Sequence, residues 1–384
     1  MADLDRRTLL RTAGRVGAAG TIAALTGRGA WQAFAPASQS ASLLGRPLRL
    51  GYLPITDASA LLGAHQLGHL SAAGLGDAQP VLFRSWDSLA QALTLGDIDA
   101  AHLLLPFALQ LRLQKQVPVK VISWAHTNGS TLTSAPHITA TAQLAGTRVA
   151  IPYWWSIHSA LTQQLLHAAG LTPVIRQRAS ASAGTVELVV MSPSDMVSAL
   201  AAGSISAFSV ADPFSAVAEA KHIGHVHRFL GDVWRDHACC AITVREDLIT
   251  RHPDAVQALS DAVVSSQGWY DTHRPDAAAS LSSYLPQPQP TIRKVFTRTE
   301  AEYRSITRHP DWHGEHLGFS GYPHESFTVR LVEMLHGTLI DGDTGWLPGD
   351  GRVAHADLVD DRFVTRSLAG AGTTVTPREE LIQP

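Results

Sequence analysis

Residues 48–104 read LRLGYLPITDASALLGAHQLGHLSAAGLGDAQPVLFRSWDSLAQALTLGDIDAAHLL and carry the clearest structural pattern in the chain. Short apolar runs, which are typical of strands, alternate there with longer runs that have helical spacing. We expect strands at 48–53, 80–84 and 100–104, and helices at 58–73 and 88–94. Strands and helices that alternate in this way predict an α/β sheet.

The pattern of buried strands continues through the middle of the chain, at residues 119–124, 148–151 and 186–191. Residues 253–284 have the composition of a helical region with an alanine-rich face. The tail, residues 370–384, is polar and rich in glycine and threonine, so we expect it to be disordered.

Two segments are candidate crossovers between separate lobes. Residues 127–130 contain Asn-Gly, which favours a turn. In residues 237–244 a strand-like run follows a loop rich in histidine and aspartate. We therefore predict one lobe from residues 47–133 and 238–365, and a second lobe from residues 134–237.

Composition and charge restrict the class of protein. With 45% hydrophobic and 16% charged residues among 384, the chain can bury a large core. Its net charge of −3 offers no basic surface for nucleic acid, so we expect none as a partner. Beyond the N-terminus, no apolar run approaches the ~20 residues that span a bilayer. The two cysteines, Cys239 and Cys240, exclude a disulfide framework and a four-cysteine zinc site.

The N-terminus has the features of a twin-arginine (Tat) export signal. Residues 5–11 read DRRTLLR, followed by a mildly apolar stretch at 13–25 and small residues at 35–37. The alternative, an amphipathic helix that opens the fold, is disfavoured because five glycines would interrupt it. We therefore exclude residues 1–40 from the fold. We expect a periplasmic or extracellular protein that associates with the membrane by binding a membrane-embedded partner.

Four motifs follow one another along the mature chain: GYLPITD at 51–57, LGDIDAAHLL at 95–104, PYWWSIH at 152–158 and ADPF at 211–214. Together they resemble the solute-binding proteins of nitrate, bicarbonate, sulfonate and taurine ABC importers, with the nitrate/bicarbonate branch nearest. The resemblance implies a two-lobed α/β periplasmic-binding-protein fold of the second type, with a small-molecule ligand in a cleft between the lobes. It also implies the membrane subunits of an importer as partners, no cofactor and a monomer.

Two other functions use the same fold. The chain resembles the thiamine-pyrimidine synthases in having a histidine near cysteines, which would suit an enzyme with a metal site, but an export signal is unexpected in a cytosolic biosynthetic enzyme. A sensor domain would need a fused output module, and the tail after residue 370 is too short to form one.

Candidate ligand contacts in the first lobe come at the ends of strands. Thr56 and Asp57 follow the first strand and are expected to cap the next helix, whose free N–H groups would face an anion; the Asp57 carboxylate itself would repel that anion. Trp86 is expected in the loop before the next helix, where the family places a ligand contact. His102, at the entry to an apolar run, is more commonly a core residue.

Further candidates lie around the two crossovers. Asn128 and Ser130 offer polar groups at a strand end, with Ser130 standing where nitrate binders carry a glutamine. The turn at 153–158 presents aromatic faces from Tyr153 and Trp155, a helix cap from Ser156, and His158, which matches the ligand-binding histidine of the family. Asp212 precedes a proline, which predicts a loop with an exposed carboxylate. The resemblance implies that this loop lies at the cleft rim.

The second crossover departs from the nitrate binders. His237 is a candidate contact, and Cys240 occupies the position of their anion-contacting lysine. A thiol supplies no permanent positive charge, so we expect a neutral, zwitterionic or planar solute rather than bare nitrate. We predict no metal site, with His237, Cys239 and Cys240 as weak candidates for a soft metal. A vicinal disulfide and plain buried packing of the thiols remain open alternatives.

Overall fold

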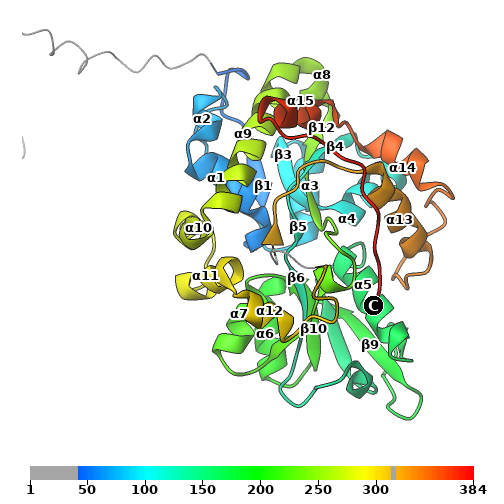
Figure 1. Ribbon diagram of the computed structural model, residues 1–384. Coiled ribbons are helices and arrows are strands. Elements are labelled where there is room, and N and C mark those ends of the chain that lie inside the picture. Colours follow the sequence, from blue (N-terminus) through cyan, green and yellow to red (C-terminus); the bar gives the residue numbers. More distant parts are fainter. Residues whose placement is uncertain (1–41, 313–316) are drawn as a thin grey trace, which may run out of the picture. The chain divides into compact units, whose positions relative to one another are not determined.

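The computed structural model describes residues 42–312 and 317–384 (Figure 1). The predicted export signal, residues 1–40, lies outside the described residues. Within them the chain forms two larger sheets and one two-stranded sheet, with helices between the strands. The predicted α/β class is therefore confirmed.

The first sheet has the strand order β2-β1-β3-β12-β4. Its strands are β1 (Leu50–Tyr52), β2 (Val81–Leu82), β3 (Ala100–Leu104), β4 (Val119–Trp124) and β12 (Cys240–Arg245). β1 runs parallel to β2 and β3, whereas β12 runs antiparallel to β3 and β4. The chain thus returns after residue 239 to place a strand in the middle of a sheet that its first third has built.

The second sheet has the order β11-β6-β10-β7-β9-β8. Its strands are β6 (Ser130–Ser134), β7 (Arg148–Ile151), β8 (Thr172–Val174), β9 (Thr185–Val190), β10 (Ala207–Ala211) and β11 (His225–Phe229). β6 is antiparallel to both neighbours, and the other pairs are parallel. The short β5 (Thr127–Asn128) pairs with β13 (Leu317–Gly318). The first sheet is built from residues 50–124 and 240–245, and the second from residues 130–229. β6 of the second sheet begins within the range predicted for the first lobe, 47–133.

Fifteen α-helices are described (Figure 1). They are α1 (Ser59–Gln66), α2 (His69–Ala72), α3 (Trp86–Leu95), α4 (Leu105–Leu109), α5 (Ile157–Ala168), α6 (Pro193–Ala201), α7 (Phe214–Ala220), α8 (Glu246–Arg251), α9 (Pro253–Thr272), α10 (Arg274–Ser280), α11 (Gln289–Thr297), α12 (Glu300–Arg304), α13 (Glu325–His336), α14 (Gly351–Leu358) and α15 (Arg362–Gly370). Four short helical turns complete the described part of the chain: η1 (Thr56–Ala58), η2 (Gln110–Gln114), η3 (Thr141–Leu144) and η4 (Leu230–Asp232). None of the helices in this part combines the length and apolarity needed to cross a membrane.

Two predicted helices are divided in the structure. The helix expected at 58–73 breaks between α1 and α2 because Gly68 adopts a left-handed conformation with φ of 73°. The helical region expected at 253–284 breaks at His273, directly before the start of α10, where Pro275 cannot continue the hydrogen-bond ladder of α9.

One apolar core connects the two larger sheets. It includes Leu103 of β3 and Trp124 of β4 from the first sheet, together with Val149 of β7 and Phe208 of β10 from the second. A second cluster packs α1 and α9 against the first sheet. The region where the first sheet meets the second is therefore closely packed, and polar side chains within it are withdrawn from water.

The end of the chain makes ordered contacts where the sequence predicts disorder. The backbone N–H of Arg235 donates to the carbonyl of Leu381 at 3.0 Å, and that of Gln383 donates to the carbonyl of Val233 at 2.9 Å. The indole N–H of Trp234 donates to the Glu380 carboxylate at 2.8 Å. Composition indicated disorder because the tail has few apolar side chains, but backbone pairing with residues 233–235 does not depend on composition.

Candidate functional site

Four chemically reactive side chains come together where strands of the first sheet end. Asp57 lies in η1 after β1, His126 lies two residues after β4, and Cys239 and Cys240 stand at the start of the antiparallel β12. Carboxyl ends of parallel strands, and the beginning of an antiparallel one, meet at the same sheet edge. One potential ligand atom from each residue lies within 4.8 Å of the other three. We call these four residues the thiol–carboxylate cluster.

The thiol–carboxylate cluster is fully buried, because each of its residues has an exposed fraction of 0%. The two sulfur atoms are 3.7 Å apart, so Cys239 and Cys240 are free thiols in this structure rather than a disulfide. Oδ2 of Asp57 and Nε2 of His126 are 3.1 Å apart. The cluster thus holds a carboxylate, an imidazole and two sulfur atoms away from water.

Three more histidines surround the cluster, and all three are buried. Nε2 of His158, on α5, lies 2.9 Å from the hydroxyl of Ser130 and 3.9 Å from Sγ of Cys239. The ring of His102, on β3, lies 5.9 Å from the ring of His126. Nδ1 of His237 lies 3.0 Å from the carbonyl oxygen of Trp234.

Many polar atoms of this region have no hydrogen-bond partner among the described residues. They include Oδ1 of Asp57, both ring nitrogens of His102, Nδ1 of His126 and Nε2 of His237. A buried polar atom without a partner costs about 1–3 kcal/mol of stability. Such a concentration in one place is typical of a site built to bind something rather than of a structural core.

The charges of Asp57 and His126 depend on each other. Burial raises the pKa of Asp57 to about 7, although the neighbouring His126 acts in the opposite direction. Burial lowers the pKa of His126, but the Asp57 carboxylate and Cys239 outweigh it and raise that pKa to about 10. The pair therefore favours an imidazolium beside a carboxylate.

Burial and neighbouring groups also shift the pKa values of the other histidines and of the two cysteines. Burial and the charge of His126 lower the pKa of His102 to about 3, and burial lowers the pKa of His237 to about 4. Burial raises the pKa of the Cys239 thiol, but its contact with Cys240 and the nearby histidines lower it well below the ordinary value. For Cys240, burial and the neighbouring Cys239 raise the pKa. Cys239 is thus the sulfur that ionises first.

Several residues predicted from the sequence reach this region. Ser130, His158, His237 and Cys240 are all buried in or beside the cluster. Asn128, on β5, instead donates from its side-chain amide to Asp236 at 3.1 Å. The expected crossover residues therefore meet, with Asn128 turned toward the loop before His237.

The predicted roles of Thr56, Asp57 and Asp212 need correction. Neither η1 nor α1 has a side-chain cap. The Thr56 hydroxyl donates to the Asp212 carbonyl at 3.0 Å, and the Asp57 carboxylate faces His126. Asp212 has an exposed fraction of 2%, rather than an exposed carboxylate, and it accepts a hydrogen bond from the hydroxyl of Ser215. The sequence correctly indicates turns at these positions, but the polar side chains contact residues from other parts of the chain instead of capping a helix or facing water.

The aromatic candidates pack against other aromatic or apolar side chains. Trp86 is the first residue of α3, buried in the core, and not part of a loop; Ser85 caps that helix by accepting from the N–H of Ser88 at 3.2 Å. The ring of Trp155 lies 4.7 Å from that of Trp346. The ring of Tyr153 lies 4.3 Å from that of Phe107, and its hydroxyl donates to Asp87 at 2.8 Å.

The expected cap of α5 is confirmed. The hydroxyl of Ser156 accepts from the N–H of Ser159 at 3.0 Å, in the first turn of that helix. This cap fixes the start of α5, from which His158 projects toward Ser130 and Cys239.

The sequence alone does not identify Asp57 and His126 as ligand contacts. Asp57 was interpreted as a helix cap, because a carboxylate repels the anions that the resemblance implies. His126 is not among the predicted contacts, although it stands two residues after the end of the buried strand at 119–124. Both residues stand just beyond the carboxyl ends of predicted strands, and the rule that ligands bind there could have found them.

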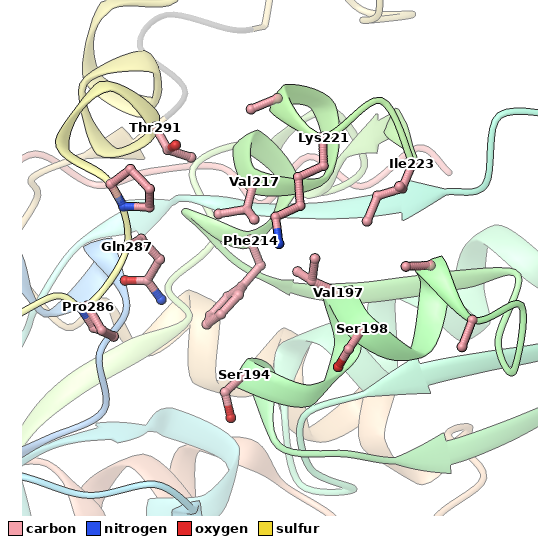
Figure 2. Close-up of a pocket in the computed structure, with 14 residues that line it drawn as sticks. Ser194, Val197, Ser198, Phe214, Val217, Lys221, Ile223, Pro286, Gln287 and Thr291 are labelled. Carbon is pink, nitrogen blue, oxygen red and sulfur yellow. The ribbon is translucent and has the colours of Figure 1, made fainter.

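A hollow lies between α6, α7 and the segment before α11, away from the thiol–carboxylate cluster (Figure 2). Its volume is about 770 Å³, and Figure 2 shows Phe214, Val197 and Gln287 among the side chains that line it. Its lining is mostly apolar or small, with Lys221 as its charged residue. It contains none of the predicted contacts and offers little chemistry for a small polar solute.

Comparison with known proteins agrees with the resemblance. Residues 45–285, more than half of the chain, match the model of the NMT1-like family. The nitrate/nitrite binding protein NrtA of Nostoc sp. is 26% identical over 306 residues, which cover 71% of this chain and 68% of that protein. The nitrate import ATP-binding protein NrtC of Synechocystis sp. is 25% identical over 361 residues, or 86% of this chain and 52% of that protein. The matches to two further NrtA proteins span about half of their length, 53% and 54%.

A solved structure supports the fold. The periplasmic nitrate-binding protein NrtA from Synechocystis superposes with a TM-score of 0.71 at 20% identity, covering 84% of this chain and 88% of that one. At 20% identity, this structural similarity shows the fold alone. The expected periplasmic-binding-protein fold is thereby confirmed.

Proposed function

The chain belongs to the NMT1-like family, and we propose that it is the exported solute-binding component of an ABC importer. In this proposal it captures a small polar solute at the thiol–carboxylate cluster and delivers it to the membrane subunits of the importer. The names of its relatives support this function, since NrtA is a nitrate/nitrite binding protein and NrtC a nitrate import ATP-binding protein. The alternative of a thiamine-pyrimidine-synthase-like enzyme gains no support from these relatives.

The observation that carries the proposal is that side chains from the parts of the chain forming the two larger sheets meet at one buried site. Cys239 precedes β12 of the first sheet, and His158 lies on α5, which packs against the second; Sγ and Nε2 of these residues are 3.9 Å apart. The backbone N–H of Thr56 also donates to the carbonyl of Asp212 at 2.8 Å. A solute bound here contacts both parts of the protein, so its binding free energy favours their closure around it.

Nitrate itself fits this site poorly. The resemblance places Cys240 where nitrate binders have a lysine, and the structure adds the Asp57 carboxylate to the same site. The missing lysine and the nearby carboxylate both disfavour an inorganic anion that is held by positive charge. We therefore expect nitrate to bind with a Kd no better than about 1 mM, or roughly −4 kcal/mol. Titration of the solute-free protein checks this, and micromolar nitrate binding would contradict it.

Export and solute-driven closure together test the proposed function. Replacing Arg6→Lys and Arg7→Lys should abolish export, as measured by cell fractionation, because the arginine pair is the part of a Tat signal that is recognised. The mature chain should become more compact in small-angle X-ray scattering when its solute binds. The proposed function is contradicted if the wild-type protein remains in the cytoplasm. It is also contradicted if the radius of gyration of the mature chain is the same with and without every solute that binds.

A further inference from the structure

We propose that Asp57, His126, Cys239 and Cys240 bind a thiophilic divalent metal cation of the zinc class. The inference rests on the proposed function and deepens it, because it names the class of solute that the site captures. From the sequence alone, a metal site has only weak candidates as ligands: His237, Cys239 and Cys240. The structure replaces His237 in that group with Asp57 and His126.

The donor set suits such a cation. Two sulfur atoms, one imidazole nitrogen and one carboxylate oxygen are the ligand types that proteins use for zinc. Thiolates select soft and borderline metals over magnesium or calcium, which prefer sets of oxygen ligands. Four protein ligands on an ion of this class correspond to a tetrahedral shell.

The distances between donor atoms agree with one shared ion. Two sulfur atoms that each lie about 2.3 Å from a tetrahedral zinc ion are about 3.8 Å apart; the sulfur atoms of Cys239 and Cys240 are 3.7 Å apart. Nitrogen and oxygen ligands at about 2.0–2.1 Å are separated by about 3.3 Å; Nε2 of His126 and Oδ2 of Asp57 are 3.1 Å apart. Since the widest separation is below 4.8 Å, closing the shell needs side-chain shifts of about 1 Å or less.

The surroundings of the donors also point to a cation. Asp57 and His126 are fully buried. Oδ2 of Asp57 and Nε2 of His126 face each other at 3.1 Å, whereas Oδ1 of Asp57 and Nδ1 of His126 have no hydrogen bond to any described residue. A metal ion would provide the coordination that these atoms lack.

His158 supports the thiol side of the site without belonging to the four donors. Its ring lies 3.9 Å from Sγ of Cys239, and its Nε2 contacts the hydroxyl of Ser130 at 2.9 Å. This contact orients the imidazole against the sulfur. Groups next to metal ligands commonly change metal affinity 10- to 100-fold when they are removed.

Cobalt(II) is the probe that tests the proposal, because cobalt thiolates have a charge-transfer absorption in the near ultraviolet. The mature chain, reduced and freed of metal, should bind one equivalent of Co²⁺ with this absorption, and Zn²⁺ should displace the cobalt. The double variant Cys239→Ser with Cys240→Ser should lose the absorption and bind Zn²⁺ at least about 100-fold more weakly.

Two controls separate the site from accidental metal binding. The double serine variant keeps all 19 histidines, so it measures metal binding by imidazoles elsewhere on the chain. His225→Gln changes a histidine on β11 that contacts Ser134 at 3.4 Å, and it should behave like the wild type. Circular dichroism establishes that both variants are folded.

The outcomes distinguish the metal site from the proposed function. Absence of a thiolate absorption in the wild type, or equal Zn²⁺ affinity in the double serine variant, overturns the metal proposal. If the wild type instead binds nitrate or ethanesulfonate tightly, the metal proposal fails while the proposed function stands. Thiolate-dependent metal binding without compaction in X-ray scattering supports the site and contradicts the proposed function.

Discussion

His158 connects the two larger sheets through one side chain. Its Nε2 lies 2.9 Å from Ser130, the first residue of β6, and 3.9 Å from the sulfur of Cys239, which precedes β12. Because the residue is buried, water cannot replace either contact when the ring is removed. At the scale of single residues, we expect that replacing His158 reduces solute affinity more than it reduces the free energy of unfolding.

We expect His158→Ala to weaken Zn²⁺ binding by about 10- to 100-fold, because the ring no longer orients Cys239. A competition titration against a chromophoric chelator measures this change. The matched control is His225→Ala, which removes a histidine that also contacts a serine hydroxyl, but in β11. If His158→Ala binds Zn²⁺ as tightly as the wild type, His158 has only a packing role.

Asp99 offers a prediction of pH dependence at a distance from the candidate site. Its carboxylate accepts from Arg46 at 2.6 Å and from Arg49 at 2.8 Å. Burial raises its pKa, but these arginines outweigh burial and lower the pKa to about 2. Because the folded-state pKa is below the unfolded value, the stabilisation is present above about pH 4 and is lost as the pH falls toward 2.

Asp99→Asn should therefore lower the free energy of unfolding by about 2 kcal/mol at pH 7. The difference from wild type should shrink to about half at pH 3. Urea unfolding at both pH values measures it, with the exposed Asp97→Asn as a control that changes stability by less than about 0.5 kcal/mol. A difference that is independent of pH would show that the arginine contacts do not account for the effect.

At the scale of elements, the start of α5 determines where His158 points. Ser156 accepts from the N–H of Ser159 at 3.0 Å and donates to the carbonyl of Tyr153 at 2.6 Å. Ser192 occupies the corresponding position before α6 but makes no side-chain cap there. The two serines form a natural pair for comparison.

Ser156→Ala should lower the free energy of unfolding by about 1 kcal/mol, because one N–H in the first turn of α5 loses its acceptor. Ser192→Ala should leave stability almost unchanged. Chemical denaturation of the two variants side by side measures both effects, and equal losses would mean that the cap contributes nothing specific.

The sequence predicted strands more accurately than helix boundaries. The expected strands at 100–104, 119–124 and 148–151 coincide with β3, β4 and β7, because a buried strand is a continuous apolar run between turn residues. The helix expected at 58–73 was divided by Gly68, whose left-handed conformation is a local choice that periodicity does not register.

The candidate site was predictable in part. The resemblance and the turn chemistry pointed to Ser130, His158, His237 and Cys240, which the structure brings into one region. His126 could not be paired with its partner from the sequence, because it lies 69 positions after Asp57 and only the folded sheet brings the two side chains together. Burial, which sets the charges of the site, is likewise a property of the folded chain.

At the scale of the whole molecule, the end of the chain holds a loop that leads into the candidate site. Glu380 accepts from the indole N–H of Trp234 at 2.8 Å, and Arg378 lies over the ring of Trp124 at 5.4 Å. Trp234 is fully buried and stacks on Phe327 at 4.4 Å. The same loop continues to His237 and the two cysteines.

Removing residues 377–384 should therefore lower the free energy of unfolding by roughly 1–3 kcal/mol, because the buried indole N–H loses its acceptor. Tryptophan fluorescence during urea unfolding measures it. Glu380→Gln keeps an acceptor and should lose less than Glu380→Ala. A shortened chain with wild-type stability would contradict the contacts described for the tail.

We propose that the protein carries its solute at the thiol–carboxylate cluster. Native mass spectrometry of the protein purified from the export compartment, without refolding or chelators, tests it most directly. We predict the mass of the mature chain with one thiophilic metal ion, and loss of that ion in the Cys239→Ser, Cys240→Ser variant. A retained organic or anionic solute without metal, or the same bound mass in both proteins, would contradict the claim.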